Sequence, residues 1–311
     1  MSSSTLTPMM QQYMETKEQY KDCILFYRLG DFYEMFFDDA LTVTKELDIT
    51  LTGKNCGLEE RAPMCGVPYH AVEGYLTRLV QKGYKVAICE QVEDPKLAKG
   101  IVKREVVRIV TPGTNINTQA LDETKNNYIM CIVYIADRYG LSVADVSTGD
   151  YFVTELDSGR KLLDEIAKFS PSEIICNESL YMSGLDLEDL KNRLGITIYS
   201  LDAWYFDDGM CTKVLKDHFK VSSLEGLGLT DYNCGLIAAG ALLQYLYETQ
   251  KTSLAHLTGI ISYTTGKYML LDSSSRRNLE LCETLREKQK RGSLSTLKTA
   301  DITHLLNWLW I

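Results

Sequence analysis

Several common signals are missing from the 311 residues. The N-terminus, Met1 to Ser4, has no basic stretch followed by an apolar one, and no run approaches the ~18 apolar residues that cross a membrane. The nine cysteines are odd in number and include no Cys-x-x-Cys pair, which disfavours a disulfide framework or a zinc site and favours reduced, mostly buried thiols. We therefore expect a cytoplasmic protein without a membrane segment.

A phosphate-binding loop is missing too. The pattern Gly-x-x-x-x-Gly-Lys-[Ser/Thr] does not occur, because Gly53-Lys54 and Gly266-Lys267 lack both the upstream glycine and the hydroxyl residue. We expect no ATPase activity, no catalytic residue and no bound cofactor in this chain.

The chain also lacks the positive charge of a typical nucleic-acid binder, since its net charge is −9. Lys+Arg against Asp+Glu is 14 to 16 in residues 1–114, 11 to 21 in residues 115–265 and 8 to 5 in residues 266–311. The acidic middle segment is the least able to lie along phosphates. The first segment can present a basic face, but its binding to DNA should be weak.

Residues 1–114 predict a small mixed α/β domain. Thr7 can cap the first helix and Pro8 can open it, and Thr111 to Gly113 should form a turn that leads into a polar linker. The predicted elements are helix 8–20, strand 24–28, helix 32–47, strand 49–53, a polar loop 54–62, helix 70–82 and strands 84–91 and 103–110.

Residues 115–265 predict a meander of three strands followed by alternating helices and strands. The last helix has a wide apolar face, which is typical of core packing, and a helical core should begin at Met269. The predicted elements are strands 128–136, 140–147 and 150–156, helix 158–168, strand 173–176, helix 185–194, strand 196–200 and helices 210–219 and 233–249.

The segment Gly30 to Phe36 sets an aromatic residue and a carboxylate two positions apart, and two interpretations are open. Asp31 and Glu34 have the spacing of a helix capping box, and Phe32 extends a helical apolar stripe, which predicts core packing. The other interpretation is a site that reads DNA. The stripe consists of Phe36, Ala40, Val43 and Leu47.

Neighbouring motifs favour the second interpretation. Gly30 to Phe36 and four further segments resemble, in order, the mismatch domain of the bacterial MutS mismatch-repair family. Asp272 to Leu281 resembles the opening of that family's core, so the resemblance spans about residues 7–292. The four segments are Thr7 to Tyr13, Pro63 to Val72, Ala87 to Gln91 and Val107 to Thr114.

The resemblance implies an α/β fold in three parts: a mismatch-recognition domain at 1–114, a ribonuclease H-like connector at 115–265 and an incomplete start of an α-helical core at 266–311. Residues 293–311 depart from the family pattern. The DNA clamp and the ATPase of full-length members, which form homodimers and use ATP and magnesium, are not in this chain.

Transferred by motif position, Phe32 is the aromatic wedge that enters the duplex, and Glu34 bonds the mispaired base. An inserted ring unstacks a base step, which costs least where pairing is already broken. Lys54 and Arg108 are candidates for phosphate contacts, with Tyr69 and His70 near the groove. The implied ligand is double-stranded DNA with mismatches or small loops.

Two other functions remain open. The chain could be a protein-interaction fragment whose connector binds a MutL-like repair partner and which has little DNA affinity of its own. A ribonuclease H-like fold also allows metal-dependent cutting by clustered carboxylates, with Asp145, Asp150 and Glu165 as the candidates. We interpret these three acids as a solvated surface and expect no metal site.

Overall fold

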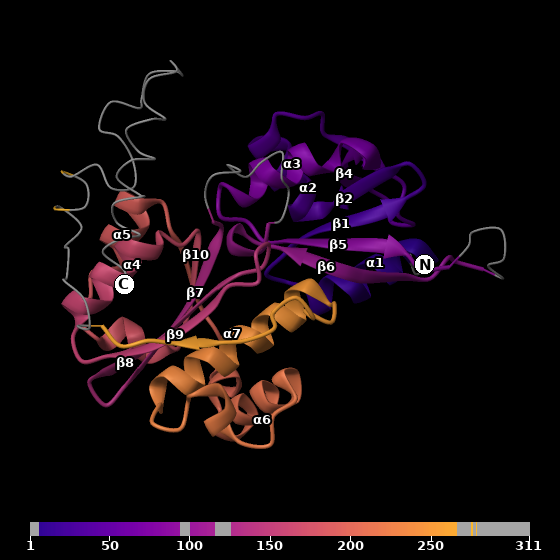
Figure 1. The fold of residues 1–311 in the computed structure, drawn as a ribbon. Coiled ribbons are helices and arrows are strands. Elements are labelled where there is room, and N and C mark those ends of the chain that lie inside the picture. Colours follow the sequence, from indigo (N-terminus) through magenta and orange to yellow (C-terminus); the bar gives the residue numbers. More distant parts are fainter. Residues whose placement is uncertain (1–5, 94–99, 116–125, 266–274, 276–277, 279–311) are drawn as a thin grey trace, which may run out of the picture.

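The chain folds as two mixed α/β units, each built on a six-stranded sheet (Figure 1). The computed structural model describes residues 6–93, 100–115, 126–265, 275 and 278. The two sheets and the seven helices of these residues agree with the predicted α/β class. Apart from residues 275 and 278, the helical core predicted at 266–311 lies outside the described residues.

The first unit contains six strands in the order β3-β4-β2-β1-β5-β6. β1 and β5 are parallel, and the other neighbouring pairs are antiparallel. Two short 3-10 turns follow β4 and β6. The elements are α1 (Pro8–Gln19), β1 (Ile24–Leu29), β2 (Phe32–Phe36), α2 (Phe37–Leu47), β3 (Thr52–Lys54), β4 (Ala62–Pro68), η1 (Tyr69–Ala71), α3 (Val72–Val80), β5 (Val86–Gln91), β6 (Arg104–Val110) and η2 (Pro112–Thr114).

Helices cover both faces of this sheet, as Figure 1 shows. α2 and α3 pack on one face, where Val43 and Leu76 join Phe26 of β1 in a buried cluster. α1 packs on the other face, where Tyr13 meets Phe36 in a second cluster. The sheet is therefore held between two apolar layers.

The predicted helix at 32–47 is wrong in its first five residues. Residues 32–36 form β2, which pairs with β1 in a hairpin, and the helix begins at Phe37. The capping box proposed for Asp31 and Glu34 therefore has no helix to cap. β4 was also missed, because Pro63, Gly66 and Pro68 are residues that strands disfavour.

The second unit is built on the predicted meander, which is confirmed. β7, β8 and β9 pair antiparallel in sequence, and β10, β11 and β12 add parallel strands to give the order β11-β10-β7-β8-β9-β12. The elements are β7 (Tyr128–Ile135), β8 (Arg138–Asp145), β9 (Tyr151–Leu156), α4 (Gly159–Phe169), β10 (Glu173–Cys176), η3 (Glu178–Met182), α5 (Leu187–Leu194), β11 (Thr197–Ser200), η4 (Ala203–Phe206), α6 (Asp208–Phe219), η5 (Leu224–Leu227), α7 (Cys234–Gln250) and β12 (Ile261–Ser262).

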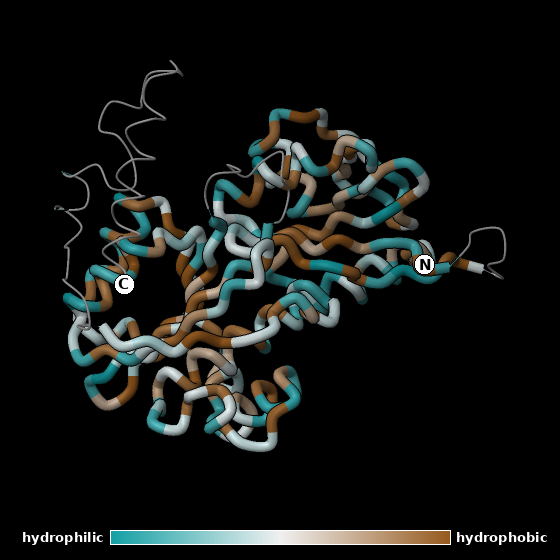
Figure 2. Tube along the Cα trace, in the orientation of Figure 1, coloured by the Kyte–Doolittle hydropathy of each residue, from teal (hydrophilic) through white to brown (hydrophobic). Residues whose placement is uncertain are grey.

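The second sheet is also covered on both faces, by α6 and α7 on one side and by α4 and α5 on the other. α7 is buried on almost every side, as expected of a helix that is apolar all round. A Cβ at Gly240 would lie 2.3 Å from the Cβ of Cys211, so this glycine lets α6 approach closely. Figure 2 shows apolar residues along the strands of both sheets.

The two units are joined by polar contacts. Glu173 of β10 is fully buried and accepts hydrogen bonds from Thr111 and from the backbone N–H of Gly113 in η2. The hydroxyl of Tyr199 donates to the carbonyl of Gly83 at 2.6 Å. The predicted turn at 111–113 thus exists and is anchored to the second sheet. We propose a domain boundary close to residue 114, immediately after this turn.

The eight cysteines among the described residues are free and buried, as predicted. Burial raises the pKa of Cys65 and Cys89 to about 12, so both stay protonated and behave as small apolar side chains. None of the helices that the structure describes combines the length and the apolar character of a membrane-spanning segment.

Candidate nucleic-acid interface

The β1–β2 hairpin presents Phe32. Its two-residue turn is Gly30-Asp31, and Gly30 has a φ of +59°, which is typical of the first central position of a type II′ turn. Phe32 is the first residue of β2, and 47% of its surface is exposed. Phe36, four residues further along the same strand, is only 1% exposed.

Glu34 lies on the same face of β2 as Phe32, because alternate residues of a strand share a face. Its Oε2 atom is 2.5 Å from the ammonium nitrogen of Lys54, at the end of β3. The side chains of Lys54 and Glu34 are 33% and 16% exposed, so the ion pair is shielded from solvent only in part. Three of the predicted residues are therefore neighbours on one face.

Gly66 of β4 lies directly opposite Glu34 in the strand register. A Cβ at this position would be 3.6 Å from Cγ of Glu34 and 3.9 Å from Cδ1 of Phe32. Glycine within a strand often marks a place where another molecule approaches the backbone. Sequence reasoning missed Gly66 because it did not assign β4.

Tyr69 and His70 follow β4 in η1, beside the hairpin. The backbone N–H of Tyr69 donates to the carbonyl of Asp31 at 2.9 Å, and the guanidinium of Arg28 lies 3.9 Å from the centroid of the Tyr69 ring. Such a cation–π contact adds to the hydrogen bond in holding the two turns together. The side chains of Tyr69 and His70 are exposed and remain available to a ligand.

Tyr33 stabilises the hairpin from the other face of the sheet. Its hydroxyl donates to Glu90 of β5, and Arg28 lies 3.8 Å from the same carboxylate. Burial, followed by the hydrogen bond to Glu90, raises the pKa of Tyr33 well above its usual value, so the hydroxyl remains a donor. Sequence reasoning gave Tyr33, Arg28 and Glu90 no role, although aromatic residues in alternation are a strand signal.

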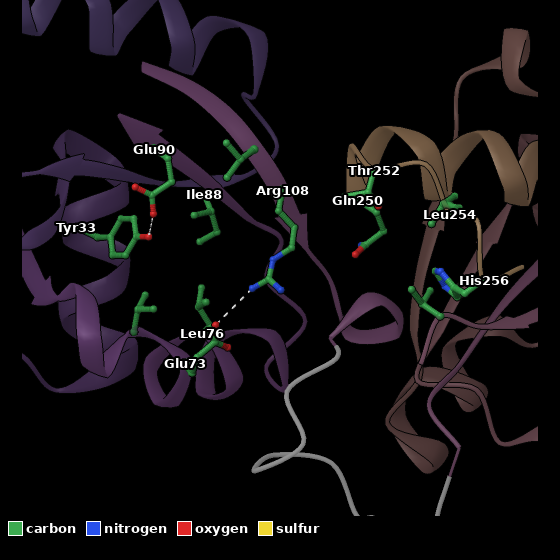
Figure 3. A pocket seen from close by; sticks show the side chains of 13 residues that line it. Tyr33, Glu73, Leu76, Ile88, Glu90, Arg108, Gln250, Thr252, Leu254 and His256 are labelled. Atoms are coloured by element: carbon green, nitrogen blue, oxygen red, sulfur yellow. Dashed lines mark hydrogen bonds and ion pairs between the residues drawn. The ribbon is translucent and has the colours of Figure 1, made fainter. Parts of the chain in front are cut away.

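Arg108 is not part of this group. It lines a cavity of about 540 Å³ between the two units together with Tyr33, Gln250 and His256, as Figure 3 shows. A guanidinium nitrogen of Arg108 is 3.5 Å from Glu73 of α3. The arginine therefore lies on the Tyr33 face of the sheet, opposite to the face of Glu34 and Lys54.

The three acids considered for a metal site are held by protein donors. Asp145 accepts hydrogen bonds from the backbone N–H groups of Asn127 and Ser147, and Glu165 accepts one from Tyr263. Asp150 accepts from Thr148. The interpretation as a solvated surface is wrong for Asp145 and Glu165, which are 1% and 7% exposed. Among the described residues, no three His, Cys, Asp or Glu side chains are grouped to hold a metal ion.

Comparison with known families agrees with this division of the chain. Residues 7–119 match MutS domain I, and residues 127–258 match MutS domain II. The two consecutive α/β units are thus a mismatch-recognition domain followed by a connector domain. The chain belongs to the MutS family.

Similar proteins named DNA mismatch repair protein MutS occur in several bacteria. The protein of Lachnoclostridium phytofermentans is 70% identical over 93% of this chain and 31% of its own length. Those of Ruminiclostridium cellulolyticum and Acetivibrio thermocellus are 55% and 52% identical, over 93% and 94% of this chain and 33% of each relative. The chain therefore spans about a third of the length of these relatives.

Proposed function

We propose that the chain recognises mismatches in DNA repair by inserting Phe32 beside a mispaired or unpaired base of duplex DNA. The exposed position of Phe32 at the end of a braced hairpin is the observation that carries this proposal. A ring that enters the base stack replaces part of the stacking it disrupts, which is worth ~1–3 kcal/mol per base. The net cost is smallest where pairing is already broken, and this difference supplies the selectivity.

Glu34 has the position to bond the displaced base. It shares a face with Phe32, and a carboxylate can accept from a base N–H or, when protonated, donate to a purine N7. Gly66, directly opposite Glu34, has no side chain that would compete with a base for the space beside Glu34 and Phe32. Tyr69 and His70 lie beside the hairpin, and the ammonium of Lys54 reaches Glu34 from β3. These three residues are proposed to contact the phosphates and the groove.

Arg108 is the second candidate for a phosphate contact, and we propose this contact only for DNA that approaches from one side. Its guanidinium lines the cavity between the units, so it can meet only a phosphate that approaches from that side. Its pairing with Glu73 also offsets part of its charge. A contribution by Arg108 would therefore be additional to the site around Phe32.

The proposed function predicts that Phe32→Ala removes the preference for mismatched DNA. The measurement is the ratio of Kd values for a matched duplex and for one with a single unpaired base, by fluorescence anisotropy at low salt. For the wild-type chain we expect a small ratio, within about tenfold, because few phosphate contacts are available. Phe32→Ala should bring the ratio to about one, with little loss of the salt-sensitive binding to matched DNA.

A matched control is available in the connector, where Trp204 is also 47% exposed. Trp204→Ala removes an exposed aromatic side chain far along the sequence and should leave the ratio unchanged. The same substitutions can be made in a chimera in which residues 7–258 replace the matching part of the Lachnoclostridium phytofermentans relative. An unchanged ratio for Phe32→Ala in both proteins would refute the wedge.

A second candidate function is binding of a MutL-like repair partner by the connector. It is favoured by two adjacent apolar side chains in η3, since Tyr181 is 53% exposed and Met182 is 83% exposed. A pull-down of a purified MutL-like protein in the absence of DNA separates the two functions. Binding that Met182→Lys abolishes and Phe32→Ala leaves intact is the result expected of this second function.

We assign the chain no ATPase activity and no cofactor of its own. The sequence lacks a phosphate-binding loop, and the matched family models are domains I and II. Binding of ATP and magnesium, and homodimer formation, are proposed only for longer members of the family.

A further inference from the structure

The ion pair between Lys54 and Glu34 affects how the Glu34 carboxylate can approach negatively charged DNA. A carboxylate beside phosphates is repelled by them, and its charge must be offset before it can approach a base. The ammonium of Lys54 is 2.5 Å from Oε2 of Glu34 and can supply this offset. The pair lies on the same strand face as Phe32, next to the proposed position of the base.

The geometry limits where the Glu34 carboxylate can point. Lys54 ends β3, Glu34 lies in the middle of β2, and β4 separates the two strands. The ammonium of Lys54 also lies 5.7 Å from the centroid of the Phe36 ring, which is fixed in the core. The lysine is thus held between a rigid aromatic ring and the carboxylate, and it draws the carboxylate toward β3.

Lys54 keeps hydrogen-bonding capacity after it has paired with Glu34. An ammonium group has three donors, and a third of the Lys54 side chain is exposed. One donor can hold Glu34 while another reaches a phosphate oxygen. A role limited to the phosphate would make Lys54 independent of Glu34, whereas a role in holding Glu34 would couple the two residues.

We propose that Lys54 is a positioning residue that determines mismatch specificity through Glu34, by fixing and neutralising its carboxylate beside the base. This inference rests on the proposed function, because it assumes that Glu34 bonds a base next to Phe32. It goes beyond a phosphate contact, which would affect matched and mismatched DNA alike.

The test is a double-mutant cycle on the full chain and on the chimera described above. Kd values for matched DNA and for DNA with one unpaired base are measured for the wild type, Lys54→Met, Glu34→Gln and the double variant, at several salt concentrations. Methionine keeps the apolar stem of lysine, and both side chains are partly exposed, so melting temperatures should stay close to that of the wild type. Lys54→Arg serves as the conservative variant.

With Glu34 present, Lys54→Met should lower the mismatch preference about threefold, as expected of a partly exposed ion pair. In the Glu34→Gln background the same change should leave the preference unaltered, and Lys54→Arg should retain it. Any phosphate contact by Lys54 would appear separately, as a salt slope smaller by about one in both backgrounds.

An equal loss of preference in the two backgrounds overturns the proposal, because Lys54 would then act without Glu34. Failure of the proposed function would give a different set of Kd ratios from failure of the Lys54 role alone. If Phe32→Ala removes the preference and the cycle shows no coupling, only the role of the ion pair is wrong. If the wild-type chain and chimera both bind matched and mismatched DNA equally, the proposed function fails and this inference fails with it.

Discussion

Replacement of Phe36 by alanine should lower the free energy of unfolding by about 3–5 kcal/mol, as expected for a fully buried aromatic residue. Replacement of Phe32 should change it by less than about 1 kcal/mol, because exposed side chains contribute little. Both residues lie on the same face of β2. The comparison therefore separates a ring that holds the core from a ring that is free to enter DNA.

The surroundings of Phe36 explain the size of this effect. Its ring meets that of Tyr13 edge-on at 4.9 Å between centroids, in the cluster that attaches α1 to the sheet. Truncation would leave a cavity there and lose the aromatic contact. Urea or thermal unfolding of the two variants measures the difference without DNA. Equal destabilisation by the two alanines would make Phe32 a core residue and remove the wedge mechanism.

The segment around Phe32 shows where sequence reasoning failed and why. The spacing of Phe32, Phe36, Ala40 and Val43 fits a helix, and α2 does bury Ala40 and Val43. Phe32 and Phe36 have the same spacing because residues four apart also share a face of a strand. Periodicity alone could not place the boundary at Phe37. The turn residues Gly30-Asp31 between two apolar segments were the signal for a hairpin.

The contacts of the candidate site depended on pairings that are distant in sequence. The motif indicated Phe32 and Glu34, but the partner of Glu34 lies 20 residues away on a strand that is not adjacent in the sheet. Arg108 appeared equivalent to Lys54 in sequence, yet the register of β6 places it on the opposite face. The pairing register of a strand determines which face of the sheet each side chain lies on, and a shift of one residue moves every side chain to the other face.

The sequence predicted secondary structure better where the hydrogen-bond partners are close together in the chain. The meander of β7, β8 and β9 followed from three apolar segments separated by short turns, and α5 ends at Leu194, as predicted for the helix at 185–194. The burial of charged side chains, in contrast, was not predicted from the sequence. Asp145 was interpreted as part of a solvated surface, yet it is buried and accepts hydrogen bonds from the backbone of Asn127 and Ser147.

Glu173 is the buried carboxylate at the junction of the two units, and its replacement should destabilise the protein. Its Oε1 accepts from the hydroxyl of Tyr245 at 2.7 Å, and its Oε2 accepts from Gly113 N at 2.8 Å and from Thr111. Glu173→Ala would leave three donors without their acceptor in a site that water does not reach. Each such group costs ~1–3 kcal/mol, so the expected loss of stability is about 3 kcal/mol or more.

Glu173→Gln is the matched control for this change. Glutamine keeps one oxygen acceptor, and its amide can donate to the hydroxyl of Tyr245, which accepts as well as donates. The loss of stability should therefore be smaller, about 1 kcal/mol. If glutamine and alanine destabilise the protein equally, the hydrogen bonds of Glu173 are not what holds the junction.

The difference in stability between the wild type and Glu173→Gln should depend on pH. Burial raises the pKa of Glu173 above its ordinary value of 4.5, although Thr111, Tyr245, Gly113 and Lys85 act in the opposite direction. A folded state with a raised pKa binds the proton more tightly than the unfolded chain. The contribution of Glu173 to stability is then fully present below pH 4.5 and is lost as the pH rises through the raised value.

Glutamine does not titrate, so Glu173→Gln lacks this contribution. The free energy of unfolding of the wild type minus that of Glu173→Gln should decrease as the pH is raised from 4 to 8, while groups common to both proteins cancel. Urea unfolding at several pH values measures this difference. A difference that grows with pH would mean that the donors around Glu173 outweigh its burial and that its pKa in the folded protein is lowered.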